Sequence, residues 1–150
     1  MKKLFYFFII LIPILALSIS FYPTDALVVD DGHTSHTFII GDGFNITIYY
    51  IHSVERSPIY EVLWVNSTGI YAIQMRWKDF GAGLPEDIQY IDADGFYVKN
   101  IDIYLGMNLS FWFIPINQAH IWVNGVLVFT PHTPTLVNFT VEKTMIVSTL

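Results

Sequence analysis

The stretch 120-HIWVNGVLVF-129 decides the fold class. Two runs of alternating apolar residues flank Asn124-Gly125, a dipeptide that tolerates the positive φ angles of a two-residue hairpin turn. The stretch therefore predicts an antiparallel β-hairpin.

Upstream of this hairpin, further segments have the same strand character. In 44-FNITIYYIH-52, Phe44, Ile46, Ile48 and Tyr50 alternate with Asn45, Thr47 and Tyr49. In 70-IYAIQMRW-77, Ile73, Met75 and Trp77 alternate with Ala72, Gln74 and Arg76. Turn-forming residues recur at 41–43, 66–69, 92–95 and 124–125, and no window beyond the N-terminal segment has a helical period. We therefore predict an all-β fold, an antiparallel sandwich or barrel-like domain of about seven to nine short strands after one N-terminal apolar helix.

The N-terminal segment resembles an export or membrane signal. Lys2 and Lys3 precede the run 4-LFYFFIILIPILALSIS-20, and no charged residue occurs from Leu4 to Thr24. As a signal peptide, the run ends in the small residues around Ser18-Ile19-Ser20. As an uncleaved anchor, it reaches Tyr22 and is about long enough to span ~30 Å of hydrocarbon. Both alternatives place the rest of the chain at the cell membrane or the extracytoplasmic face, or outside the cell if the segment is cleaved.

The predicted organisation is a signal peptide or anchor at 1–24, a spacer at 25–37 and an extracytoplasmic β domain at 38–150. The chain of 150 residues has a net charge of −6, and such an acidic surface repels nucleic acid, so we expect no nucleic-acid binding. It contains no cysteine, so an exported domain would be held by its core alone.

Four N-glycosylation sequons agree with export. They begin at Asn45, Asn66, Asn108 and Asn138, whereas the numbers of Asn, Ser and Thr predict roughly one by chance. The alternative is that Asn and Thr are simply common in β-turns and at strand edges.

The sequence offers little for catalysis or metal binding. His52 and Ser53 are adjacent in a predicted strand, so their side chains point to opposite faces and cannot form a nucleophile–base pair. His33 and His36, with Asp30 and Asp31, are weak metal-ligand candidates in the predicted spacer. We expect no enzyme activity and no cofactor.

Charge is concentrated in 50-YIHSVERSPIYEVLWV-65, although only 13% of the chain is charged. Pro58 removes a backbone donor and ends or bulges the strand, where exposed charges are common. Alternatively, His52 and Arg56 recognise a carboxylate while Glu55 or Glu61 orients them. A second segment, 76-RWKDFGAGLPED-87, has Lys78 at the entrance of a small-residue loop whose backbone permits close approach.

Together these two segments resemble the domain-of-unknown-function family numbered 1850, small exported proteins of archaea and bacteria. The match covers roughly Phe44 to Phe129, and Ser57 departs from it because threonine is usual there. The matching residues are His52, Ser53, Val54, Glu55, Pro58, Tyr60 and Glu61, then Phe80, Gly81, Ala82, Gly83, Leu84 and Pro85.

Members of this family are often encoded beside tripartite ATP-independent transporters, so the resemblance implies an accessory role in solute uptake with a permease or solute receptor as partner. We expect the two segments to form one composite surface. Its candidate binding residues are His52, Ser53, Glu55, Arg56, Pro58, Glu61, Lys78, Gly81, Gly83 and Pro85. The alternative function is a cell-surface structural, filament or glycoprotein module that assembles through strand edges.

Overall fold

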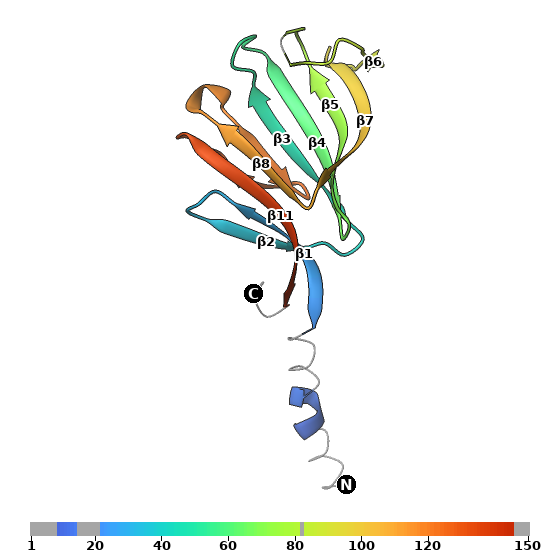
Figure 1. Cartoon of the computed structure of the whole chain (residues 1–150), viewed down its shortest axis with the longest axis vertical. Coiled ribbons are helices and arrows are strands. Elements are labelled where there is room, and N and C mark those ends of the chain that lie inside the picture. The colour runs from blue at the N-terminus through green and yellow to red at the C-terminus, as the bar shows by residue number, and fades with distance from the viewer. Residues whose placement is uncertain (1–8, 15–21, 82, 146–150) are drawn as a thin grey trace.

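The computed structural model describes residues 9–14, 22–81 and 83–145. Residues 9–14 are helical, and the remaining described chain is almost entirely β structure (Figure 1). Most of the predicted signal peptide or anchor, 1–8 and 15–21, lies outside the described residues. Among those described, no helix has the length and apolarity to span a membrane.

Two antiparallel sheets pack face to face as a sandwich, so the predicted fold class is confirmed. The described residues contain eleven strands, more than predicted. The smaller sheet has the order β2-β1-β11-β8, and the larger sheet has the order β10-β9-β3-β4-β5-β7-β6. The strands are β1 (Pro23–Asp30), β2 (Ser35–Ile39), β3 (Phe44–Ile51), β4 (Pro58–Asn66), β5 (Gly69–Trp77), β6 (Tyr90–Ile91), β7 (Tyr97–Gly106), β8 (Asn108–Phe113), β9 (His120–Val123), β10 (Val126–Phe129) and β11 (Thr135–Met145), with a 3-10 helix at Pro115–Asn117.

The segment predicted as a spacer, 25–37, lies in β1 and β2 instead, which corrects that boundary. β1 pairs with β11 along its whole length, from Pro23 opposite Met145 to Asp30 opposite Asn138. Leu27 and Val29 are fully buried in the core. The segment is therefore part of the sandwich, because its apolar residues alternate inward and its backbone is hydrogen-bonded on both sides.

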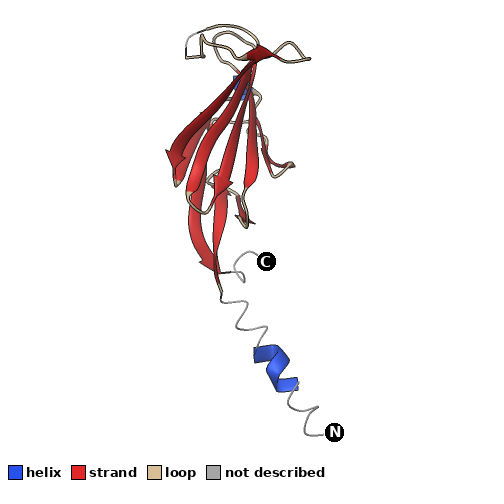
Figure 2. Ribbon diagram, turned by 90° about the vertical axis from the view of Figure 1, so that its right-hand side faces the viewer, coloured by secondary structure: helices blue, strands red, loops and turns tan. Residues whose placement is uncertain are grey.

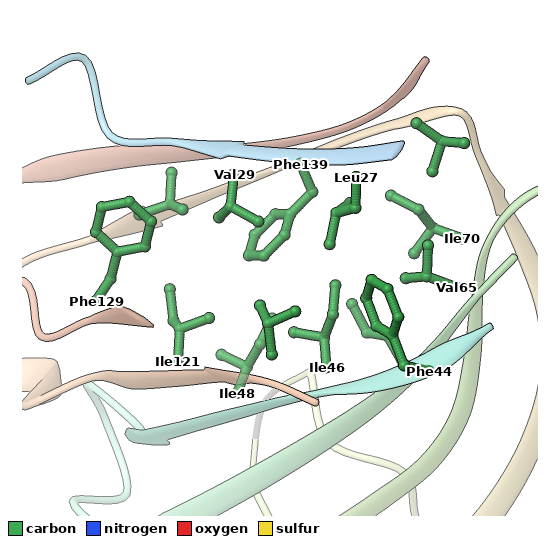
Figure 3. Close-up of a cluster of buried hydrophobic side chains, with 14 of the residues drawn as sticks. Leu27, Val29, Phe44, Ile46, Ile48, Val65, Ile70, Ile121, Phe129 and Phe139 are labelled. Atoms are coloured by element: carbon green, nitrogen blue, oxygen red, sulfur yellow. The ribbon is translucent and has the colours of Figure 1, made fainter. Parts of the chain in front are cut away.

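The main core lies between the sheets (Figure 3). The face that Phe44, Ile46 and Ile48 share in the predicted alternation points into it, and so do side chains of the predicted hairpin at 120–129. From the smaller sheet come Leu27, Val29, Phe113, Val137, Phe139 and Val141, and from the larger sheet Phe44, Ile46, Ile48, Leu63, Val65, Ile70, Ile121, Val123 and Phe129. This packing fixes which face of each strand of the larger sheet points outward.

One predicted alternation is altered by a bulge. The register of β4 with β5 shifts so that Leu63 lies opposite Ala72 and Val62 opposite Gln74. Ala72 therefore packs against the core, while Gln74 and Arg76 lie on the outer face. An extra residue in one strand moves the side chains that follow it to the opposite face of the sheet, which simple alternation cannot anticipate.

The domain is elongated, with loops at one end and the start of β1 and the end of β11 at the other (Figures 1 and 2). We call the loop end the tip and define it as the β3–β4 turn, residues 52–57, together with the β5–β6 loop, residues 78–89. Ile59 and Trp77 are fully buried but lie outside the main core cluster, so the end of the sheet that carries the tip has a small apolar cluster of its own.

Candidate functional site

The two sequence segments that carry the family resemblance meet at the tip. A Cβ atom at Gly81 would overlap the side chain of Glu55, so the glycine backbone lies directly against that carboxylate. The predicted juxtaposition of the charged turn and the glycine loop is therefore observed, and the bare backbone of Gly81 permits this close approach. A binding role for this surface stays a prediction.

The turn at 52–57 is built around His52. Its backbone N–H donates to Ser57 O at 2.8 Å, and its carbonyl accepts from the Arg56 N–H at 3.0 Å. The imidazole Nδ1 accepts from the Glu55 N–H at 3.2 Å. These bonds close the turn and place Ser53, Val54 and Arg56 on its exposed side.

Arg56 occupies a backbone conformation that is unusual for its residue type. Its φ is +58°, in the left-handed region that costs a non-glycine residue of the order of 1 kcal/mol. Its exposed side chain forms no ion pair with the described residues. The turn thus holds a free guanidinium outward at the tip, where it can pair with a carboxylate from another molecule.

The glycine loop is anchored at several points. The Leu84 N–H donates to Gly81 O at 3.1 Å, closing a turn in which Gly83 has a φ of +84°. Farther along, Lys99 on β7 binds both carboxylate oxygens of Asp87, at 2.6 and 2.8 Å. The Phe80 ring packs against Tyr97, with centroids 4.6 Å apart.

Apolar side chains are exposed around this loop and turn. Val54 is 67% exposed and Phe80 is 50% exposed, and Tyr90 and Ile91 on the short strand β6 are also exposed. Pro58 and Pro85 are half-buried beside them. Exposed apolar and aromatic side chains together with an unpaired arginine are residue types that are enriched at protein–protein interfaces.

Trp77 and Ser57 are buried at the same end of the sheet. Trp77 lies opposite Ile59 on the inner face, and its ring contacts Tyr97 with a centroid separation of 6.1 Å. Among the described residues, no hydrogen bond reaches Ser57 Oγ or Trp77 Nε1. Each of these two residues therefore buries a polar atom that has no hydrogen-bond partner in the described part of the chain.

Lys78 and Glu61 make their contacts with other parts of the larger sheet. Lys78 donates to Asp94 O at 3.0 Å and lies 4.7 Å from the Phe96 ring centroid. Glu61 is in the middle of β4, opposite Ile48, and its side chain points inward. The structure therefore does not bring Glu61 next to Arg56 at the tip.

Glu61 belongs to a half-buried polar pair that sequence reasoning missed. The Tyr50 hydroxyl donates to Glu61 Oε1 at 2.7 Å. Burial raises the pKa of Glu61, although the hydrogen bond from Tyr50 partly opposes the rise. Burial, followed by the neighbouring Glu61 charge, raises the pKa of Tyr50. The register of the β3–β4 hairpin could have suggested this pair, because both residues are on the inner face of neighbouring strands.

A second missed group lies on the outer face below the tip. Arg76 contacts Asp92 through Nε at 2.9 Å and through Nη2 at 2.6 Å, and its guanidinium lies 4.9 Å from the Phe96 ring centroid. Asp92 Oδ1 also accepts from the backbone N–H groups of Asp94 and Phe96. The bond from Phe96 and the Arg76 charge lower the pKa of Asp92. The turn signal at 92–95 marks this group in the sequence.

The weak metal candidates are distributed along the β1–β2 hairpin. Asp31 Oδ1 accepts from the backbone N–H groups of His33 and Thr34 and so closes the turn. The His36 ring packs against Phe129, with centroids 5.1 Å apart. Within the described ranges, no cluster of three or more histidine or acidic side chains is close enough to hold a metal ion.

The four sequons occupy different environments. Asn45 is exposed on the outer face of the larger sheet, and Asn66 is the last residue of β4, immediately before the β4–β5 turn. Asn108 and Asn138 are on the smaller sheet, on β8 and β11. The Asn66 and Asn138 side-chain oxygens accept hydrogen bonds from Thr68 and Ser110, respectively.

Comparison with known proteins gives one match. Residues 46–128 match the model of a family described as Domain of unknown function (DUF1850). The match begins in β3 and ends in β10, covers more than half of the chain and includes both segments of the tip. No curated protein and no solved structure matches the chain significantly.

Proposed function

Because the chain belongs to the family described as Domain of unknown function (DUF1850), we propose that it is a non-enzymatic accessory or binding component of a membrane solute transporter of the tripartite ATP-independent type. In this proposal the N-terminal segment directs the chain to the cell membrane or the extracytoplasmic face. The tip then binds the transporter permease or its solute receptor.

One observation carries the proposal: the two segments that characterise the family resemblance form a single exposed surface. Gly81 packs against Glu55, which couples the position of the loop to that of the turn. The β3–β4 turn presents Arg56 two residues after the exposed Val54. Apolar surface excludes water at an interface, and an arginine supplies directional hydrogen bonds to a partner carboxylate.

The test is affinity purification of the detergent-solubilised protein from its own cells, with co-purifying chains identified by mass spectrometry. We expect a permease or solute receptor with the wild type. With the Arg56→Ala variant, the amount of partner recovered should be at least tenfold lower, since an interface arginine at a hot spot contributes about 2 kcal/mol or more to binding.

The matched control is Lys143→Ala, which removes an exposed cation near the end of β11, far from the tip. It should recover the partner as the wild type does. Equal losses with both variants would contradict a role for the tip. Recovery of the chain without any partner from the wild type and from both variants would contradict the transporter proposal.

The second candidate function is a cell-surface module that assembles through strand edges. The observation that favours it is β10, an edge strand of the larger sheet on which Val126 and Leu127 are exposed. Unpaired backbone groups beside apolar side chains can add a strand from another copy. Sedimentation over a range of concentrations tests this idea: assembly that Leu127→Lys abolishes would support it, and a monomer at every concentration would exclude it.

A further inference from the structure

A row of aromatic side chains crosses the outer face of the larger sheet. Trp64 on β4 lies opposite Tyr71 on β5, and Tyr71 lies opposite Tyr104 on β7. The Tyr71 and Tyr104 ring centroids are 5.1 Å apart. We call these three residues the aromatic row. It faces away from the core, because the neighbouring residues Val65 and Ile70 point inward.

Asn45 extends this row by one strand. It is the cross-strand partner of Trp64 and is exposed, so Asn45, Trp64, Tyr71 and Tyr104 occupy corresponding positions on four adjacent strands. With an interstrand spacing of about 4.8 Å, the row extends about 14 Å from Asn45. That length can accommodate a short oligosaccharide.

The ends of the row are held by glycines. A Cβ atom at Gly43 would overlap the Trp64 ring, and a Cβ atom at Gly69 would overlap the Tyr104 ring. Each ring therefore lies close to bare backbone. Tyr104 still leaves 54% of its surface exposed, and Trp64 and Tyr71 are half-buried. Rings fixed in this way lose little conformational freedom when a ligand stacks on them.

Asn45 begins the sequon Asn45-Ile46-Thr47, and its side-chain amide forms no hydrogen bond with the described residues. In contrast, the Asn66 and Asn138 oxygens are bound by hydroxyl groups of the chain. Asn108 is exposed, but its cross-strand partner is Thr140 rather than an aromatic residue. Asn45 is thus a free acceptor amide that adjoins a ready-made apolar surface.

We propose that Asn45 carries an N-linked glycan whose first sugars stack on the aromatic row. The C–H groups on one face of a pyranose ring are apolar and carry a small positive charge, which suits the negative face of an aromatic ring. The row carries no ionised group, and so fits a neutral sugar. The Gln74–Asn100 amide pair, at 2.9 Å, lies on the neighbouring position of the same face and offers hydrogen bonds to sugar hydroxyls.

The test is made on the full chain purified from its own cells. Mass spectrometry of glycopeptides measures occupancy at Asn45, and thermal unfolding is followed for the wild type, Asn45→Gln, Trp64→Ala and the double variant. We expect an occupied Asn45 and a melting temperature about 2–4 °C lower for Asn45→Gln, the shift that the loss of one aromatic stacking contact produces in a domain of this size. In the Trp64→Ala background, Asn45→Gln should have no effect.

Tyr104→Ala replaces Trp64→Ala if the latter does not fold, since Tyr104 is more exposed. Asn108→Gln is the matched control, and its effect should be the same with and without Trp64. An unmodified Asn45 peptide would overturn the proposal. A glycan at Asn45 whose removal changes the melting temperature equally in both backgrounds would overturn it as well, because the sugars would then not rest on the row.

Discussion

The half-buried pair of Tyr50 and Glu61 gives a sharp prediction for Tyr50→Phe. The substitution removes one hydroxyl that donates to a carboxylate at 2.7 Å and leaves the ring that packs against Phe113 in place. A hydrogen bond to a charged group contributes about 1.5–3 kcal/mol, and a buried carboxylate without its donor also keeps its desolvation penalty. We therefore expect the free energy of unfolding to fall by about 1.5–3 kcal/mol at pH 7.

The assay is urea unfolding at pH 7 and at pH 4. At pH 4 more of Glu61 is protonated, and a bond to a neutral acceptor contributes only about 1 kcal/mol, so the loss should be smaller. The matched control is Tyr49→Phe, which removes the hydroxyl of the preceding residue on the opposite, outer face. No hydrogen bond to that hydroxyl exists within the described structure, so its removal should change the free energy of unfolding by less than about 0.5 kcal/mol.

Equal losses for Tyr50→Phe and Tyr49→Phe would refute the reasoning, since one removes a buried charge-assisted bond and the other does not. A loss for Tyr50→Phe that is larger at pH 4 than at pH 7 would refute the assignment of the carboxylate as the acceptor.

Three further predictions follow from the same structure. Glu61→Gln should stabilise the domain relative to the wild type by an amount that grows as the pH rises. Because the pKa of Glu61 is raised in the folded state, the wild-type carboxyl stabilises the fold below its ordinary pKa of 4.5, and this contribution is lost as the pH rises through the folded-state pKa. The free energies of unfolding of the two proteins should therefore diverge from pH 4 to pH 7, and a constant difference would contradict this prediction. Gly81→Ala should cost about 1 kcal/mol by displacing Glu55, and the cost should vanish in a Glu55→Gly background, which a double-mutant cycle measures. Trp77→Ala should lower the free energy of unfolding by about 3–5 kcal/mol because the side chain is fully buried, whereas Trp112→Ala at a 62% exposed site should cost much less; similar urea midpoints for the two variants would contradict this.

Local patterns were sufficient for the elements that depend on neighbours in sequence. Asn124-Gly125 predicts the β9–β10 hairpin, and alternation puts Ile46 and Ile48 on one face of their strand, as observed; that face packs into the core. The same reasoning could not place residues 25–37. Their strand forms by pairing with β11, more than a hundred residues later, and no local signal identifies such a partner.

The candidate site also contains features that depend on the three-dimensional arrangement of the strands and not on local sequence. The proximity of Glu55 and Gly81 was predicted from the family resemblance, and no residue pattern within either segment implies it. The bond between Tyr50 and Glu61 requires the hairpin register, which the length of the turn at 52–57 sets. The bulge near Ala72 is a three-dimensional adjustment of one strand to its neighbours, and it escaped the alternation rule for that reason.

The arrangement of the chain ends opposite the tip has a mechanical consequence. Pulling Pro23 away from Met145 would load the β1–β11 ladder at its first pair and open its hydrogen bonds one after another, as in a zip. A force between the start of β1 and the tip (Figure 1) instead has to pass from the smaller sheet to the larger one, and the two sheets are joined by the packed side chains of the core rather than by a hydrogen-bonded ladder. A load between the base and the tip is therefore resisted by the core between the sheets, whereas a load that separates the two chain ends opens the pairing of β1 with β11 one residue pair at a time.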